Sequence, residues 1–267
     1  MPDTTQTLQT VTSADGTTIA YDRLGDGPAV VLVSGGSTDR MANAGLAAAL
    51  APSFTVFNYD RRGRGPSGDT PPYAVAREVE DLAALITAVG GTAAVYGHSS
   101  GAGLLVEAAA AGLPISKAVL HEPPYSPDDP EAQRQSDESA VVVERLIAEG
   151  QNLNAVTEFL QMTGMPEDAA KEWAASNGLA ALAPTIPHDF AVMDSSPGGV
   201  VPVGKLARVG QPALALCGSV SPPFMVDAAR LVAKALPNGQ YVELEGHHHV
   251  VPPELLAPVI GDFLSPR

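Results

Sequence analysis

Residues 95–103 read VYGHSSGAG, and this stretch decides the fold. It places a Gly-x-Ser-x-Gly pattern between an apolar run at 92–96, which predicts a strand, and a run at 100–111, which predicts a helix. A serine in such a turn has a strained backbone, and the flanking glycines leave room for it. Ser99 would then stand at the helix N-terminus, where free N–H groups favour a developing anion. A glycine-rich turn with an ordinary serine is the alternative, but this context favours a nucleophile.

On both sides of this motif the chain alternates predicted strands with predicted helices. Continuous apolar runs indicate buried strands, and apolar residues at helical spacing indicate helices. Strands are expected at 17–24, 28–33, 54–59, 92–96, 213–217 and 240–244 and in the run that ends at 122, and helices at 39–50, 75–89, 100–111, 226–236 and 253–263. This alternation predicts an α/β fold whose parallel sheet is covered on both faces.

The alternation is lost between residues 123 and 200. This segment holds Pro-rich turns and amphipathic helical stretches such as 140–148, and it contains no convincing strand. We therefore expect a core domain made of residues 1–122 and 201–267, with a helical insertion at 123–200 between two core strands.

A serine nucleophile needs an adjacent base, and three histidines follow the last predicted strand, 240–244. His249 lies closest to the final predicted helix and is the preferred base, with His248 as the reserve. Three histidines could instead hold a metal, but adjacent residues of an extended loop cannot all face one ion. We therefore expect no metal and no cofactor.

Two backbone N–H groups should bind the oxyanion. One belongs to Ser100, the residue after the nucleophile, and the other to the loop after the strand 28–33. That loop reads Ser-Gly-Gly-Ser at 34–37, and Gly36 has no side chain to keep a substrate away from the backbone. A tight-turn glycine is the alternative, and it is compatible with the oxyanion role.

The base also needs a carboxylate that fixes its tautomer. In α/β folds with this serine motif, the carboxylate usually lies in the loop that here follows the strand 213–217. This loop reads GSVSPP and contains no acid. The preceding strand ends at Glu122, and neighbouring parallel strands end at the same edge of a sheet. Glu122 is therefore the predicted acid, with a helix cap or ion pair as the alternative. His121 alternates to the other face and is expected to be packed.

Together these residues resemble the α/β-hydrolase superfamily over nearly the whole chain. More narrowly, GHSSGA at 97–102, HEPP at 121–124, the missing later acid and the position of Gly36 look like zearalenone-type lactone hydrolases. The resemblance implies a mostly parallel eight-stranded sheet and a helical cap at 123–200. It also favours the histidine three residues beyond Gly246. The implied Ser, His, Glu triad is carried onto Ser99, His249 and Glu122.

The expected activity is cofactor-independent serine hydrolysis of a carboxylic ester or lactone through an acyl-enzyme. Acyl transfer or perhydrolysis would use the same triad, and a binding protein on the same fold would hold a small molecule without turnover. Epoxide hydrolases and dehalogenases of this fold carry an Asp where this chain has Ser99, and are disfavoured. Trp173 and His98 are candidates for substrate contact, although a lone tryptophan more often packs inside a cap.

Composition narrows the partners further. The chain has 267 residues, 45% of them hydrophobic, which suits one globular domain with an insertion. Its formal net charge of -15 disfavours nucleic acid and anionic membranes as partners. The single cysteine, Cys217, is expected to be a small buried hydrophobe without a disulfide partner. The chain starts without a signal-peptide pattern and shows no membrane-spanning run, so a cytoplasmic protein is expected. Its oligomeric state cannot be predicted.

Overall fold

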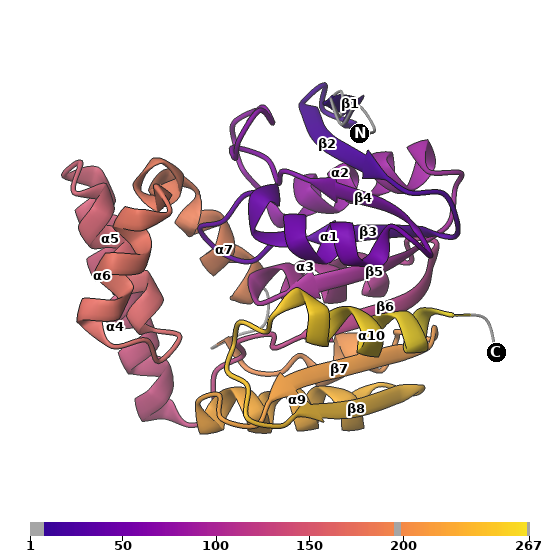
Figure 1. The fold of residues 1–267 in the computed structure, drawn as a ribbon. Helices are drawn as coiled ribbons and strands as arrows, with labels where there is room; N and C mark the ends of the chain where they lie inside the picture. Colours follow the sequence, from indigo (N-terminus) through magenta and orange to yellow (C-terminus); the bar gives the residue numbers. More distant parts are fainter. Residues whose placement is uncertain (1–7, 195–198, 266–267) are drawn as a thin grey trace.

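The structure, a computed structural model, describes residues 8–194 and 199–265 and is built around one eight-stranded sheet (Figure 1). The strands are β1 (Gln9–Thr12), β2 (Thr18–Leu24), β3 (Ala29–Val33), β4 (Thr55–Tyr59), β5 (Ala93–His98), β6 (Ile115–His121), β7 (Ala213–Gly218) and β8 (Gly239–Leu244). Their order is β1-β2-β4-β3-β5-β6-β7-β8. β2 pairs antiparallel with β1 and β4, and the other neighbours are parallel. The predicted α/β-hydrolase sheet is confirmed.

β1 is the strand that sequence reasoning missed. It reads Gln-Thr-Val-Thr, and three of its four residues are exposed. The apolar run that would indicate a strand is therefore absent, and β1 is held at the edge of the sheet by its pairing with β2.

Helices cover both faces of the sheet because strand side chains alternate between them. Val31 and Val33 of β3 join one apolar cluster, which includes residues of α2 (Val75–Ala88), α3 (Ser100–Ala110) and α9 (Pro223–Ala235). Val30 and Leu32 join the other, with α1 (Ala44–Leu50) and α10 (Pro253–Leu264). Short helices η1 (Arg40–Asn43) and α8 (Val203–Leu206) complete the core.

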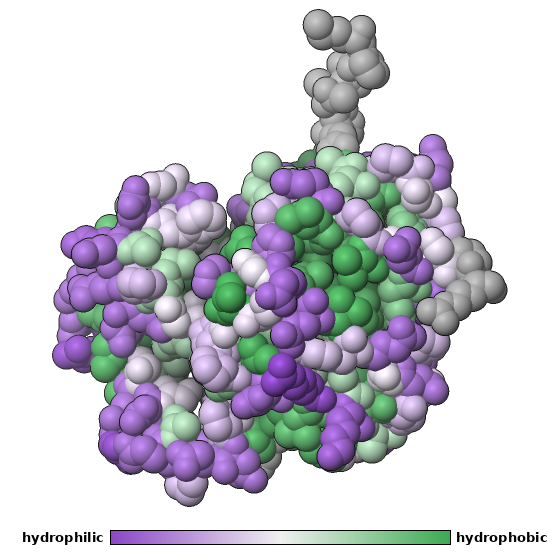
Figure 2. Space-filling model, turned by 60° about the horizontal axis from the view of Figure 1, so that its bottom comes forward, coloured by the Kyte–Doolittle hydropathy of each residue, from purple (hydrophilic) through white to green (hydrophobic). Residues whose placement is uncertain are grey.

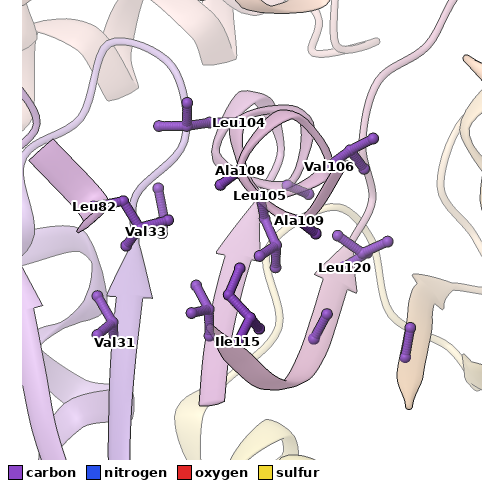
Figure 3. Close-up of a cluster of buried hydrophobic side chains, with 14 of the residues drawn as sticks. Val31, Val33, Leu82, Leu104, Leu105, Val106, Ala108, Ala109, Ile115 and Leu120 are labelled. Atoms are coloured by element: carbon purple, nitrogen blue, oxygen red, sulfur yellow. The ribbon is translucent and has the colours of Figure 1, made fainter. Parts of the chain in front are cut away.

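α3 is the central helix of the first cluster. Figure 3 shows Leu105 and Ala109 of this helix pointing toward the strands, with Val31 of β3 to the left and Leu120 of β6 to the right. Its first residue, Ser100, directly follows the predicted nucleophile, so packing of α3 on the sheet fixes the position of the nucleophile turn.

Between β6 and β7 the chain leaves the sheet and forms a group of helices, which we call the cap. They are α4 (Pro130–Ala148), α5 (Asn152–Gln161), α6 (Glu167–Ser176), the 3-10 helix η2 (Leu179–Thr185) and α7 (Ile186–Met193). These helices share their own apolar cluster, which includes Val143, Val156 and Ile186. α4, α5 and α6 stand to one side of the sheet in Figure 1. The predicted insertion, 123–200, contains residues 195–198, which lie outside the described residues.

The cap forms a lobe beside the core, and its outer surface is mostly hydrophilic (Figure 2). α7 returns the chain to the core, where it packs against α3. Among the described residues, no helix is both long enough and apolar enough to cross a membrane.

Because the apolar clusters bury some leucines and leave others exposed, truncating a buried leucine should destabilise the fold more than truncating an exposed one. Leu32 is fully buried in β3, whereas Leu231 on α9 is 44% exposed. We expect Leu32→Ala to lower the free energy of unfolding by about 2–5 kcal/mol, because it leaves a cavity in the sheet core. Leu231→Ala should change it by less than about 0.5 kcal/mol. Urea denaturation followed by circular dichroism measures both, and equal losses would contradict this packing.

Candidate active site

Ser99 occupies the turn between β5 and α3 in a backbone conformation that few side chains adopt. Its φ is +55° and its ψ is -126°. The flanking glycines are required by close contacts: a Cβ at Gly101 would lie 2.6 Å from the carbonyl oxygens of Val33 and Ser34, and one at Gly97 would collide with the Gly101 carbonyl. Packing therefore holds Ser99 in a strained turn at the end of the strand.

Glu122 occupies the matching position on the neighbouring strand. His98 pairs with His121 in the parallel register of β5 and β6, so the next residues, Ser99 and Glu122, leave the sheet side by side. The Ser99 N–H donates to the His121 carbonyl at 2.8 Å. Glu122 also has a positive φ, +47°, and its N–H donates to the Leu216 carbonyl of β7 at 3.0 Å. The predicted neighbourhood of β6 and β7 is confirmed.

The Glu122 carboxylate is fully buried, and both of its oxygens are hydrogen-bonded. Oε2 is 2.5 Å from Nδ1 of His249. Oε1 accepts from the Gly218 N–H at 2.6 Å, the Ser221 hydroxyl at 2.7 Å and the Cys217 thiol at 3.3 Å. Burial alone would raise the pKa of Glu122, but the hydrogen bond and charge of His249 and the Gly218 N–H lower it to about 2. Glu122 is therefore an anion.

The end of β7 and the loop after it contain no acid, and they supply hydrogen bonds to Glu122 instead. Sequence reasoning missed Gly218 and Ser221 as partners of Glu122. The one available signal was a loop rich in small donors where an acid usually stands. Cys217 is buried as predicted, and its thiol also donates to Glu122. Burial and the neighbouring carboxylate raise the pKa of the Cys217 thiol, so the sulfur stays protonated.

His249 is the histidine that meets Glu122. A carboxylate accepts hydrogen bonds, so Nδ1 of His249 carries a proton in this contact, and Nε2 is the ring nitrogen that does not contact Glu122. His248, the reserve candidate, is exposed to solvent and makes no hydrogen bond to Glu122. His247 is half-buried, and its ring also makes no hydrogen bond to Glu122.

His98 holds the backbone of His249. Its Nε2 lies 2.9 Å from the His249 carbonyl oxygen, and the two rings are 4.5 Å apart. Because the carbonyl only accepts, Nε2 of His98 carries a proton. Burial, together with the neighbouring His249 and His121 imidazoles, holds the pKa of His98 well below its usual range. His98 is not among the residues that line the cavity described below, and its predicted contact with substrate stays a prediction.

His121 is packed, as the strand alternation predicts. It is buried, and its Nδ1 lies 2.7 Å from the Tyr96 hydroxyl. Burial lowers the pKa of His121 to about 4, even though the Glu122 charge opposes this. His121 is therefore neutral at physiological pH and belongs to the packing around the site.

Of the two predicted oxyanion residues, Ser100 directly follows Ser99, and Gly36 lies in the loop that meets the same turn. Ser100 begins α3, so its N–H has no acceptor in the helix. The loop of Gly36 contacts the nucleophile turn, since a Cβ at Gly35 would lie 3.1 Å from Cβ of Ser99. Within the described residues, neither the Gly36 N–H nor the Ser100 N–H makes a hydrogen bond. Both N–H groups are therefore without an acceptor among these residues.

The hydroxyl of Ser99 makes no hydrogen bond within the part of the chain that the structure describes. The contact between its Oγ and Nε2 of His249 is therefore not formed in this structure. Such contacts are often long in free enzymes and shorten in the complex with substrate.

A buried ion-pair network joins the cap to the core behind Ser100. Oδ1 of Asp189, on α7, accepts hydrogen bonds from Arg61, Arg64 and Ser100, each at 2.7 Å. Arg61 also donates from Nε and Nη2 to the two carboxylate oxygens of Glu78, each at 2.7 Å. Burial opposes ionisation of Asp189, but the charges of Arg64 and Arg61 and the Ser100 hydroxyl lower the pKa of Asp189 to about 2. Sequence reasoning did not identify Asp189.

A cavity of about 340 Å³ opens beside Ser99, between the core and the cap. Ser99 and Ser100 lie at its core side. Most of its wall is apolar and comes from the cap, the loop that leads into it and the core helix α9: Pro124, Phe159, Met162, Phe190, Met193 and Phe224. The charged residues that line it are Asp137, Asp189 and Asp194.

Trp173 does not line this cavity. It lies on α6 with 47% of its surface exposed, so neither the predicted substrate contact nor the alternative of a cap-core tryptophan describes it. The apolar cluster of the cap is made of smaller side chains from all five cap helices, with Ala174 as the buried contribution of α6. In the described ranges, no group of three or more His, Cys, Asp or Glu side chains is arranged to hold a metal ion.

Comparison with known proteins identifies relatives over most of the chain. Residues 30–258 match the model of the Alpha/beta hydrolase family. An alpha/beta hydrolase from Sphaerobacter thermophilus DSM 20745 is 45% identical, with a TM-score of 0.88 over 96% of this chain and 100% of that chain. A thermophilic esterase from Thermogutta terrifontis is 22% identical, with a TM-score of 0.73 over 97% and 98% of the two chains. This second likeness shows the fold alone.

A curated relative matches only a short stretch. The probable oxidoreductase EphD of Mycobacterium tuberculosis is 38% identical over 91 residues, which cover 32% of this chain and 15% of that protein.

The lowered pKa of Glu122 predicts a pH-dependent stability difference. A depressed carboxyl pKa stabilises the fold above the unfolded value of 4.5, and this contribution is lost as the pH falls toward about 2. Glu122→Gln should therefore lower the free energy of unfolding by about 2–3 kcal/mol at pH 7 and by roughly half as much near pH 3. Urea denaturation at both pH values measures this. A difference independent of pH would show that the ionised Glu122 does not stabilise the fold.

Proposed function

We propose that this chain, which belongs to the alpha/beta hydrolase family, is a serine hydrolase that cleaves a carboxylic ester or lactone through an acyl-enzyme. The observation that carries the proposal is the 2.5 Å contact between Glu122 and His249. Glu122 follows β6, and Ser99, in its strained turn, follows the neighbouring strand β5. A carboxylate with this partner orients an imidazole for proton transfer, which a serine hydroxyl requires.

In the proposed reaction, Oγ of Ser99 attacks the carbonyl carbon while Nε2 of His249 takes its proton. The ionised Glu122 stabilises the imidazolium that forms. The N–H groups of Gly36 and Ser100 hold the negative oxygen of the tetrahedral intermediate. Collapse of this intermediate breaks the bond to the alcohol, which leaves with the proton from His249. Water then attacks the acyl-enzyme with His249 as base, and the acid is released.

The cavity suggests which esters are accepted. Its wall is largely apolar, and its charged lining residues are all acidic. Burial and the nearby Asp137 and Glu144 raise the pKa of Asp194, so negative charge is already crowded there. We therefore propose an uncharged ester or lactone as substrate. The sequence resemblance to zearalenone-type lactone hydrolases adds a macrocyclic lactone as one candidate.

Covalent labelling tests the nucleophile and its base. Treatment with an alkyl fluorophosphonate should give one adduct by intact-mass spectrometry, because an activated serine attacks the phosphorus centre. Ser99→Ala should give none. Labelling of Glu122→Gln and of His249→Gln should be at least about a hundredfold slower, since the base is misoriented or lost.

His248→Gln is the matched control, because it changes the adjacent exposed histidine. It should be labelled at the rate of the unmodified protein. An adduct that persists in Ser99→Ala, or a His248→Gln variant that loses labelling while His249→Gln keeps it, would contradict these assignments. An unlabelled wild-type protein would refute the serine hydrolase proposal and favour a binding protein.

Charge selectivity tests the substrate class. We expect kcat/KM for p-nitrophenyl methyl succinate, which is neutral, to exceed that for p-nitrophenyl hydrogen succinate by at least about tenfold, because the free carboxylate is repelled by Asp137 and Asp194. Asp194→Asn should reduce the ratio of the two kcat/KM values, and added salt should reduce it as well. Equal values for the two esters in the wild-type protein would exclude an acidic cavity as a determinant of specificity.

A further inference from the structure

We propose that Asp189 is a positioning residue that holds both arms of the oxyanion hole, so that one cap carboxylate sets the geometry in which the negative oxygen is bound. This proposal rests on the serine hydrolase function proposed above. Asp189 belongs to α7, and the residues it contacts belong to two separate elements of the core.

The first arm is Ser100, whose N–H is one proposed donor. Its side chain faces Asp189: the hydroxyl donates to Oδ1 at 2.7 Å and accepts from Nη1 of Arg61 at 3.0 Å. Ser100 is buried, so water does not compete for these bonds. The residue after the nucleophile is thus fixed from behind by the Asp189 and Arg61 pair.

The second arm is the loop that carries Gly36. The N–H of Ser37 donates to Oδ2 of Asp189 at 3.2 Å. A Cβ at Gly36 would lie 2.5 Å from Cζ of Phe159 and 3.2 Å from Cγ of Asp189, so the carboxylate and the Phe159 ring both pack close to Cα of this residue. Ser37 has a positive φ of +49°, a conformation that a non-glycine residue keeps only when its surroundings impose it.

Arg64 ties the same loop to the same carboxylate. Its Nη2 donates to Oδ1 of Asp189 at 2.7 Å, while its Nη1 donates to the carbonyl oxygens of Gly35 at 2.5 Å and Thr38 at 3.0 Å. In the described residues, Asp189 is the only carboxylate in an ion pair with Arg64. Loss of the Asp189 charge would therefore leave Arg64 buried without a counter-ion and disturb the carbonyls on either side of Gly36.

Asp189 is suited to position these groups without repelling the oxyanion. Its negative charge lies next to the hole and would by itself oppose a second anion. The two guanidinium groups of Arg61 and Arg64 share its Oδ1 and offset that charge. What remains is a set of short, directional hydrogen bonds that hold the donors before reaction, as electrostatic preorganisation requires.

The test is the rate of fluorophosphonate labelling in Asp189→Asn and Ser100→Ala, followed by intact-mass spectrometry. We expect the maximal labelling rate constant of Asp189→Asn to fall by about tenfold to a hundredfold, while the half-saturating reagent concentration stays within about twofold. Ser100→Ala keeps the N–H and removes only the hydroxyl, so it should fall less. The double variant should lose less than the product of the two single losses, because both act through one contact.

Asp81→Asn is the matched control for stability. Asp81 is also a buried carboxylate, and it forms a paired contact with the buried Arg62 at 2.7 and 2.8 Å, but it touches neither arm of the hole. Asp81→Asn and Asp189→Asn should both lower the urea midpoint. Only Asp189→Asn should slow the labelling of molecules that circular dichroism shows to be folded.

The outcomes separate this proposal from the one it rests on. A wild-type protein that takes no label refutes the hydrolase function and this inference together. A labelled wild-type protein with a folded Asp189→Asn variant that reacts equally fast overturns this inference alone, as does an equal slowing in Asp81→Asn. If Asp189→Asn does not fold, Ser100→Ala decides: labelling at the wild-type rate overturns the inference, and slower labelling at unchanged half-saturation supports it.

Discussion

The parallel pairing of β5 with β6 is the constraint on which the site depends. It sets His98 beside His121, so the next residues, Ser99 and Glu122, leave the sheet together. Both have a positive φ, which ends the strands sharply and directs the chain out of the sheet at its carboxyl edge. The strain at these two positions is tolerated because the hydrogen bonds of Ser99 to His121 and of Glu122 to Leu216 hold the backbone on either side.

The buried position of Glu122 explains the character of the loop after β7. A buried carboxylate is stable as an anion only when its oxygens are satisfied. Gly218, Ser221 and Cys217 provide these donors, and His249 takes the remaining oxygen. The end of β7 and its following loop thus donate hydrogen bonds to the carboxylate that follows β6. The contact with Glu122 is made by Nδ1 of His249, so the folding of this loop also fixes the orientation of the His249 ring.

Much of the core could be predicted from the sequence, because buried parallel strands and amphipathic helices leave apolar runs of different period. β1 could not, since an exposed edge strand needs no apolar residues. Ser99, His249 and Glu122 could be selected because they follow strands whose ends meet. Asp189 could not, because it lies in a cap helix whose approach to Ser100 depends on tertiary packing. For the same reason the sequence did not indicate that Trp173 would face solvent.

The cap is attached near Ser99 by buried ion pairs as well as by apolar contact, and the ion pairs constrain its position differently. Arg61 and Arg64 face Glu78 and Asp189, so the buried network is electrically balanced, as buried ions must be to persist. Apolar burial depends on area and tolerates sliding of one surface over another, whereas charge-assisted hydrogen bonds specify both distance and direction. An apolar interface could bind the cap equally tightly, but it would not fix the distance and orientation of α7 relative to Ser100 as narrowly.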